Sequence, residues 1–334
     1  MIGPQAAGTW YDDMSDNANG PAGAGRSRLD WLRRYGLPLA LAVIFAGLSA
    51  ATPNFLTAQN LIIVLRQISI NGILAVGVTF VLLTGGVDLS LGSVLALSGV
   101  VAAHCAHPGA WPLAFPVVVG MLVGCACGGA NALVVTRGRV PSFIVTLGMM
   151  TVARGLALVA SGGKPVSNLS KGFCLIGGGE ALGIPVPVII LACVAALAYV
   201  VLRHMRVGRH VYAVGGNEAA ARASGLRVGR IKCFAYVTCG ALAGLAGVVL
   251  AARITTGQPN AGIAYELDAI AAAVIGGTSL SGGVGGVGGT ILGALLMGVI
   301  NNGLDLLNVP SYYQQIVKGL IIVGAVWIDR GGRR

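Results

Sequence analysis

The chain has 334 residues, of which 55% are hydrophobic and only 10% are charged. Because a soluble domain carries roughly 25% charged residues, this composition excludes ordinary soluble enzymes. It favours an all-α integral membrane protein whose helices form a polytopic bundle. The net charge of +11 would suit a nucleic-acid partner, but the basic residues cluster between apolar runs, as they do on the cytoplasmic side of membrane proteins. We therefore expect no nucleic-acid partner.

The apolar runs predict about ten transmembrane helices, since one crossing needs about 20 apolar residues. Residues 1–36 are polar and predict a disordered cytoplasmic tail, 37–329 predict the transmembrane domain, and 330–334 form a basic cytoplasmic tail. The even number of crossings puts both termini in the cytoplasm. The expected spans lie near residues 37–52, 61–83, 88–106, 112–136, 142–160, 185–202, 230–252, 267–279, 287–303 and 312–328.

A Gly-Gly motif occurs twice, each time between two apolar runs. Residues 85–92 and 276–283 are identical at five of eight positions, which indicates an internal repeat of the kind found in transporters. Chance similarity in a chain rich in glycine, leucine and serine is the alternative. Asp88 is expected to cap the following helix or to contact a partner protein. The candidates for a cytoplasmic turn or partner contact are Gly85, Gly86, Asp88, Gly276, Gly277 and Ser279.

Several polar side chains lie within or beside the predicted spans. A pathway for an uncharged solute needs hydroxyl and amide groups, but the same groups also bond helices to each other inside a membrane. Both readings stay open for this set. The candidates for the translocation path are Gln67, Asn71, Thr79, Asn301 and Asn302.

The segment 203–232 is a basic loop between two spans and is expected in the cytoplasm. Its core is a run of good helix formers bracketed by glycines, which predicts one or two helical turns outside the bilayer. Such a helix suits a groove on a soluble partner. The alternative is a solvated loop that only sets orientation. The candidate coupling residues are Gly216, Asn217, Glu218, Ala219, Ala220, Arg222 and Gly225.

Charged residues near the predicted outer face form a further candidate group. Arg253 ends the seventh span, whereas Glu266 and Asp268 begin the eighth. They are expected to pair with one another or to contact an extracytoplasmic protein. Arg154 lies in an otherwise apolar span, where snorkelling to the interface, an internal ion pair and a pathway role all remain open.

No set of residues indicates a catalytic, metal or cofactor site. The chain lacks a phosphate-binding G-x-x-x-x-G-K-[ST] motif, so any ATP and Mg²⁺ are used by another chain. A secondary transporter driven by an ion gradient is the alternative function. That class usually needs acids within the membrane, whereas the acids here lie near span ends.

Six segments in this order carry a family resemblance over most of the chain. They are Phe55–Leu61, Leu83–Ser93, Ala153–Gly155, Ala213–Ala221, Ile275–Gly283 and Gln314–Gly319. Together they resemble the permease subunit of ribose-type monosaccharide ABC importers. Relatives often carry a basic residue after Gly283, where this chain has Val284.

The resemblance implies a multi-pass protein of the bacterial inner membrane. It also implies that two permease chains, identical or paralogous, form the pore for a sugar. ATP-binding subunits would dock on the cytoplasmic loops, with 203–232 as the coupling loop. A periplasmic sugar-binding protein would deliver the substrate to the outer face. The particular sugar does not follow from these motifs.

Overall fold

The fold was analysed in a computed structural model, which describes residues 23–331. Residues 1–22 and 332–334, and with them most of the two predicted tails, lie outside the described residues. The helices are α1 Gly23–Ala51, α2 Ala58–Leu83, α3 Leu91–Cys105, α4 Ala114–Arg137, α5 Ser142–Ser161, α6 Lys171–Gly178, α7 Val186–His204, α8 Arg206–Gly216, α9 Glu218–Ala223, α10 Val228–Arg253, α11 Tyr265–Ile275, α12 Val287–Leu306 and α13 Ser311–Gly331. A small antiparallel hairpin joins β1 Glu180–Ala181 to β2 Ile184–Pro185.

Six of the described helices are long and apolar enough to cross a membrane: α2, α4, α5, α7, α10 and α12. Two shorter apolar helices, residues 36–51 of α1 and all of α3, accompany them. In a bilayer only a helix or a closed barrel satisfies every backbone polar group, so long apolar segments fold in this way. The prediction of an all-α, polytopic membrane protein is confirmed. α1 begins at Gly23, so residues 23–36, which were expected in the tail, are helical.

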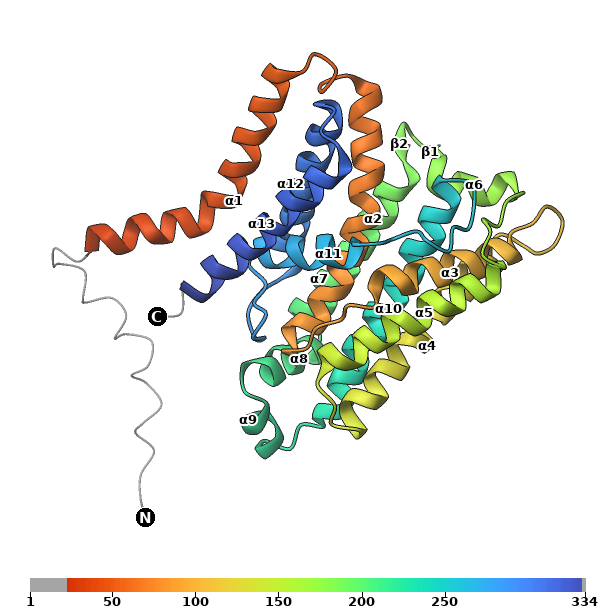
Figure 1. Ribbon diagram of the computed structural model, residues 1–334. Coiled ribbons are helices and arrows are strands. Elements are labelled where there is room, and N and C mark those ends of the chain that lie inside the picture. The colour runs from red at the N-terminus through yellow and green to blue at the C-terminus, as the bar shows by residue number, and fades with distance from the viewer. Residues whose placement is uncertain (1–22, 332–334) are drawn as a thin grey trace.

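Helix α10 is the centre of the bundle and packs against α4, α3 and α2 (Figure 1). Its contact with α4 is made of backbone against backbone. A methyl group on Gly124 of α4 would overlap the carbonyl oxygen of Gly240 of α10, and one on Gly240 would overlap that of Gly124. Small residues at such spacings let two helices approach closely inside a membrane. The glycines of α4 and α10 therefore allow the two backbones to come into direct contact.

Helices α3 and α11 are too short to cross a bilayer alone. Fifteen and eleven residues correspond to roughly 22 and 16 Å of helix, against about 30 Å of hydrocarbon. The predicted spans 88–106 and 267–279 therefore differ from the helices: α3 begins only at Leu91, after a non-helical segment, and α11 ends at Ile275, before Gly276. The glycines at both breaks favour such interruptions.

The two short helices meet at their N-terminal ends. Gly92 at the start of α3 lies against the carbonyl of Gly262, just before α11, and against the carboxylate of Glu266. α3 runs from there towards the end of the bundle that holds the β1–β2 hairpin, the hairpin side, whereas α11 runs towards the end that holds α9, the α9 side (Figure 1). The chain thus contains two half-length helices that point in opposite directions from a common meeting point.

Helices α1 and α13 lie together on one side of the bundle (Figure 1). α1 packs mainly on α12, and α13 packs mainly on α11. α1 bends along its length, and Pro38 lies inside it. A proline removes one helical hydrogen bond and crowds the preceding turn, which accounts for a bend. Elsewhere the outward faces carry exposed apolar side chains such as Leu122, Val159 and Leu197, as expected of a surface in lipid.

Candidate coupling site

The predicted helical turns between two spans are present as α9. The side chain of Asn217 accepts a hydrogen bond from the backbone N–H of Ala220 at 2.9 Å and so caps the helix. At the other end Gly225 has φ +81°, a conformation that glycine adopts without strain, and Leu226 N–H bonds to the carbonyl of Ala221. A helix of six residues is unstable by itself, so its flanks must hold it in place.

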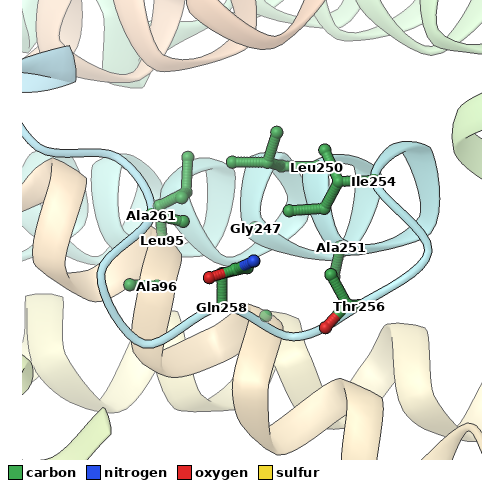
Figure 2. A pocket seen from close by; sticks show the side chains of 10 residues that line it. Leu95, Ala96, Gly247, Leu250, Ala251, Ile254, Thr256, Gln258 and Ala261 are labelled. Carbon is green, nitrogen blue, oxygen red and sulfur yellow. The ribbon is translucent and has the colours of Figure 1, made fainter. Parts of the chain in front are cut away.

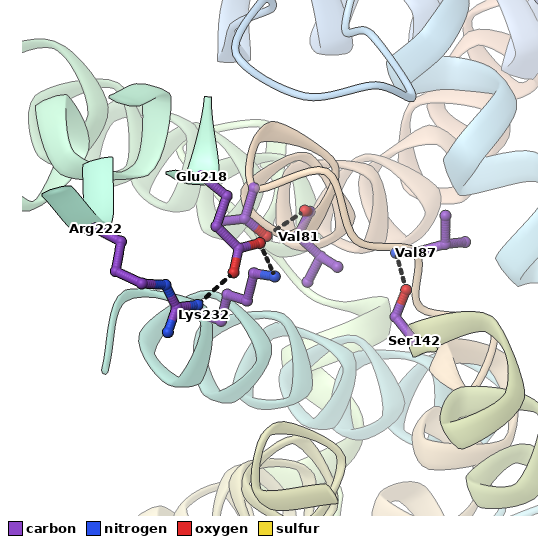
Figure 3. Close-up of polar contacts among 7 residues, drawn as sticks. Val81, Val87, Ser142, Glu218, Arg222 and Lys232 are labelled. Carbon is purple, nitrogen blue, oxygen red and sulfur yellow. Dashed lines mark hydrogen bonds and ion pairs between the residues drawn. The ribbon is translucent and has the colours of Figure 1, made fainter. Parts of the chain in front are cut away.

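Glu218 joins α9 to the start of α10 (Figure 3). One carboxylate oxygen accepts from Arg222 at 2.8 Å and the other from Lys232 of α10 at 2.7 Å. The hydrogen bond from Lys232 is the main reason why the pKa of Glu218 lies below its ordinary value. The Glu218 side chain is 42% exposed, so water screens the two ion pairs. Together they contribute about 1 kcal/mol or less.

Helix α8 connects α9 to the two Gly-Gly turns. Gly215, near the end of α8, is packed so closely on the carbonyl of Leu83 that a methyl group there would overlap it. Gly283 donates its N–H to that same carbonyl at 3.0 Å. Tyr212 donates its hydroxyl proton to the carbonyl of Gly285 at 2.9 Å. The end of α2, the turn after α11 and the end of α8 therefore meet on the α9 side.

The first turn leads from α2 into α3 and buries an acid. Asp88 is 1% exposed, and one of its oxygens accepts from both the N–H and the hydroxyl of Ser90, at 2.9 and 2.6 Å. Asn131 donates in turn to the Ser90 hydroxyl at 3.1 Å. Asp88 thus holds the turn just before α3, whose first helical N–H groups receive no side-chain cap, and its burial leaves no surface for a partner. Gly85, at φ +76°, makes the bend that precedes it.

The second turn, between α11 and α12, is more open. Gly276 lies against the backbone of Gly289, so a side chain at Gly276 would overlap it. Gly277 has φ +87°, and Ser279 is 1% exposed. The side chain of Ser279 accepts from the N–H of Ser281 at 3.2 Å. The six turn residues predicted from the repeat therefore lie in two segments that contact each other.

The five polar residues predicted for the path all lie on α2 and α12, which pack against each other. Asn302 exchanges two hydrogen bonds with Asn60, at 2.8 and 3.1 Å. Thr79 bonds to Thr290 at 2.8 Å. Asn71 and Asn301 are buried, and the carboxamide oxygen of each lacks a hydrogen-bond partner among the described residues. Gln67 is half-buried in α2.

The three charged residues predicted for an outer surface do not form one group. Asp268 is 4% exposed and pairs with Lys318 of α13 at 3.0 Å. Glu266 lies at the meeting point of α3 and α11. Arg253 ends α10 and is partly buried. The pairing of Asp268 with Lys318 ties α13 to α11, and sequence analysis missed it. The sequence signal for this pair was Lys318, a single lysine within an apolar run.

Arg154 also has a defined partner that the sequence left open. It extends from α5 and donates to the carbonyl oxygens of Pro259 and Ala261, at 2.5 and 2.8 Å. These carbonyls belong to the segment that leads from α10 back to the start of α11. Arg154 therefore holds a non-helical segment in place by hydrogen bonds to backbone that would otherwise need water.

Beside that segment lies a small pocket between α3 and α10, with Gln258 in its wall (Figure 2). Its volume is about 10 Å³, which is about the space of one water molecule. A monosaccharide does not fit in this pocket. On the α9 side, a larger cleft of about 650 Å³ opens between α9, α10 and the connection of α4 to α5.

Comparison with known proteins identifies the family. A family model described as the permease component of branched-chain amino acid transport systems matches residues 60–326. The chain belongs to this permease family. No solved structure matches the chain.

Individual relatives show which kind of permease the chain is similar to. Ribose import permease protein RbsC of Escherichia coli K12 is 48% identical over 303 residues, which cover 90% of this chain and 94% of the relative. Its counterpart in Bacillus subtilis is 46% identical, with 90% and 93% covered. The D-allose transport system permease protein AlsC of Escherichia coli K12 is 40% identical, with 89% and 91% covered. The resemblance to ribose-type importer permeases is confirmed.

Proposed function

We propose that this chain forms the membrane pathway of an ATP-driven importer for a monosaccharide. The substrate class is inferred from the relatives, whose names specify ribose and D-allose. The proposed coupling to the ATP-binding subunit is inferred from the contacts of α8 and α9. A capped surface helix, α9, is joined through α8 to the turns that follow α2 and α11. A force applied to α9 therefore reaches two interrupted segments of the bundle directly.

The α9 side is proposed to face the cytoplasm. The basic residues between Arg203 and Lys232 are concentrated there, and such loops stay on the cytoplasmic side. The six long apolar helices, with α1, α13 and the two short helices α3 and α11, each completed by the non-helical segment before it, then give about ten transmembrane segments and put both termini in the cytoplasm. The hairpin side would face the periplasm of a bacterial inner membrane.

Three kinds of partner follow from this role. An ATP-binding subunit docks on α9 and supplies all nucleotide chemistry, since this chain has no phosphate-binding loop motif. A periplasmic sugar-binding protein docks on the hairpin side, where Arg253 at the end of α10 is a candidate contact. Asp268, which is buried and paired with Lys318, and Glu266, at the meeting point of α3 and α11, do not lie on that surface. A second permease copy completes the pathway, which would run between the two chains.

Among the polar residues of α2 and α12, Asn71 and Asn301 are the best candidates to touch the sugar. Each has a buried carboxamide oxygen without a partner in the described residues. A sugar hydroxyl is a suitable donor for such an oxygen. Thr79 and Asn302, by contrast, are used in bonds between helices, and their loss would act through packing. Gln67 stays a path candidate on its position in α2.

The proposal is tested by transport in liposomes. The chain is purified in mild detergent with the ATP-binding subunit that accompanies it and reconstituted, and the binding protein is added with labelled ribose or labelled leucine. We expect uptake of ribose that needs internal ATP and is insensitive to dissipation of the proton gradient. Uptake by this chain alone that follows an ion gradient would overturn the proposal in favour of a secondary transporter. Uptake of leucine and not ribose would overturn the substrate class.

A further inference from the structure

The cleft beside α9 has walls from four segments that are far apart in sequence. The turn after α2, the connection between α4 and α5, helix α9 and the first turn of α10 all contribute. Its volume is about 650 Å³, which is the size of a site for a small molecule or for a few side chains. The residues that line it include Thr84, Arg139, Ser142, Glu218, Arg222 and Lys232.

The charges in this cleft are mostly positive. Arg139, Arg222 and Lys232 line it, and Glu218 is the one acid among the lining residues. Glu218 is already shared between Arg222 and Lys232, at 2.8 and 2.7 Å (Figure 3). Arg139 is exposed and has no ion pair or hydrogen bond within the described part of the chain. The cleft therefore offers positive charge that no acid among residues 23–331, the described part, neutralises.

Three further basic residues are neighbours in sequence of residues that line the cleft. Arg137 follows Thr136 at the end of α4, Arg227 and Arg230 flank Val228 and Gly229 at the start of α10, and all three are exposed. A concave surface with one sign of charge attracts the opposite sign and orients it on approach. An occupant that carries carboxylates complements the site, whereas an apolar helix does not.

We propose that an acidic segment of the ATP-binding subunit enters this cleft, where its carboxylate pairs with Arg139 and competes with Glu218 for Lys232. This inference rests on the proposed function and adds a second contact to α9. The position of the cleft supports a protein occupant, because α9 itself forms one wall. A subunit that binds α9 also covers the mouth of the cleft, because Glu218 and Arg222 of α9 line it.

The competition for Lys232 has a mechanical consequence. In the free chain the ion pair between Glu218 and Lys232 holds α9 on α10, the central helix of the bundle. When an incoming carboxylate takes Lys232, α9 keeps its cap at Asn217 but loses its bond to α10. α9 then keeps only its packing against α10, so α8 and α9 follow the subunit more readily than α10 does.

The first test is charge reversal. Arg139→Glu is compared with Arg206→Glu, which makes the same change at an exposed position of α8 that does not line the cleft. We expect Arg139→Glu to weaken binding of the co-purified ATP-binding subunit about tenfold at low salt, a change of about 1.4 kcal/mol. Arg206→Glu should change it less than twofold. Equal losses in both variants would indicate only general attraction to a basic surface and would overturn the proposal.

A photo-crosslinking amino acid identifies the occupant directly. At Gly229, which lines the cleft and where an added Cβ would make only an ordinary contact with Thr136, it should crosslink to an Asp- or Glu-rich segment of the ATP-binding subunit. The same probe at Ala220, exposed on α9, reports docking itself. A crosslink at Ala220 together with none at Gly229, or with a crosslink from Gly229 to lipid or to a second copy of this chain, overturns this inference alone. The absence of a crosslink at Ala220 counts against the proposed function.

Reversal of the captured acid provides the confirming result. Changing the crosslinked Asp or Glu of the subunit to Lys should weaken binding to the unaltered chain and restore at least half of the binding lost in Arg139→Glu. Charge pairs in direct contact show such coupling. If the two changes simply add, the two groups do not meet and the proposal is wrong.

Discussion

The two Gly-Gly turns share most of their sequence and one local hydrogen bond, but they have different surroundings. In the first turn the side chain of Asp88 accepts from the N–H of Ser90, and in the second Ser279 accepts from Ser281 in the same way. After this bond the first turn continues directly into α3. The second continues through a glycine-rich segment of residues 282–286 before α12 begins.

The same motif has different contacts in the two turns. Where the first turn has Leu91, fully buried at the start of a helix, the second has Gly282, at φ +87°. A side chain at Gly282 would meet the backbone of Gly215. The first turn is therefore held in the bundle by the buried side chain of Asp88. The second turn instead provides the backbone surface on which α8 packs.

The largest effect is expected where α8 contacts both turns. Gly215→Val places a side chain against the carbonyl of Leu83 and the N–H of Gly283, so α8 must move away from both. We expect sugar uptake to fall at least tenfold while the protein still inserts and binds its ATP-binding subunit. The matched control is Gly216→Ala, whose added methyl group meets open space and should retain most of the uptake. Equal behaviour of the two variants would show that close packing at Gly215 is unimportant.

A change at the first turn should act on stability. Asp88→Ala removes the acceptor for two bonds to Ser90 and should lower the free energy of unfolding by about 1–3 kcal/mol. Asp88→Asn keeps an oxygen acceptor and should lose less. Thermal unfolding in detergent measures both. A fully stable Asp88→Ala protein would mean that the bonds from Ser90 to Asp88 do not hold the first turn.

The equivalent change at the second turn should be milder. Ser279→Ala removes one acceptor for Ser281 and should cost about 1 kcal/mol or less, since that bond joins two neutral groups. Comparison with Asp88→Ala in the same assay tests whether the first turn is the more firmly anchored. A larger loss in Ser279→Ala than in Asp88→Ala would reverse the distinction drawn between the two turns.

The bond between Thr79 and Thr290 joins α2 to α12, the helices that flank the two turns. Thr79→Val keeps the shape of the side chain and leaves Thr290 with its bond to the carbonyl of Gly286. We expect a loss of about 0.6–1 kcal/mol in stability and an unchanged apparent affinity for the sugar. A change in affinity with no change in stability would instead assign Thr79 to the pathway.

The smallest effect concerns pH and α9. Because Lys232 lowers the pKa of Glu218 in the folded chain, the ion pairs contribute fully above the ordinary pKa and are lost as pH falls through the lowered value. The mobility of a spin label at Ala223 should therefore be constant from pH 7 to 5 and rise below about pH 4. In Lys232→Gln the label should be more mobile already at pH 7. A transition near pH 6 would contradict this assignment.

Much of the fold was predictable from local sequence. Six apolar runs correspond to six long helices, because a membrane leaves a long apolar segment few alternatives. The glycine-bracketed run at 216–225 contains α9, and its cap at Asn217 follows from residue type. The repeat predicted two similar turns on one side of the bundle. Local helix propensity and hydropathy are sufficient for all of these.

The partners of individual charged residues were not predictable in this way. Lys232 and Lys318 find Glu218 and Asp268 only because α9 folds onto α10 and α13 onto α11. The start of α3 was also missed: the predicted span began at Asp88, three residues before the helix begins at Leu91, because hydropathy averaged over a long window does not resolve a short non-helical segment. Arg154 was left between three roles, and its bonds to two backbone carbonyls depend on a segment about a hundred residues later. Such contacts depend on packing between helices that composition does not encode.

We expect α8, α9 and the second turn to move as one unit, because Tyr212 and Gly215 of α8 contact Gly285 and Gly283 of that turn. Spin labels at Ala220 and at Val284, both exposed, measure the distance within this unit, and labels at Val284 and Leu182 measure its distance to the hairpin side. Both distances are recorded by pulsed electron paramagnetic resonance in the reconstituted importer, with ATP and without nucleotide. We predict that the first distance stays constant while the second changes. A change in the first distance with a constant second distance would contradict the account, because α9 would then move without the turn on which it is seated.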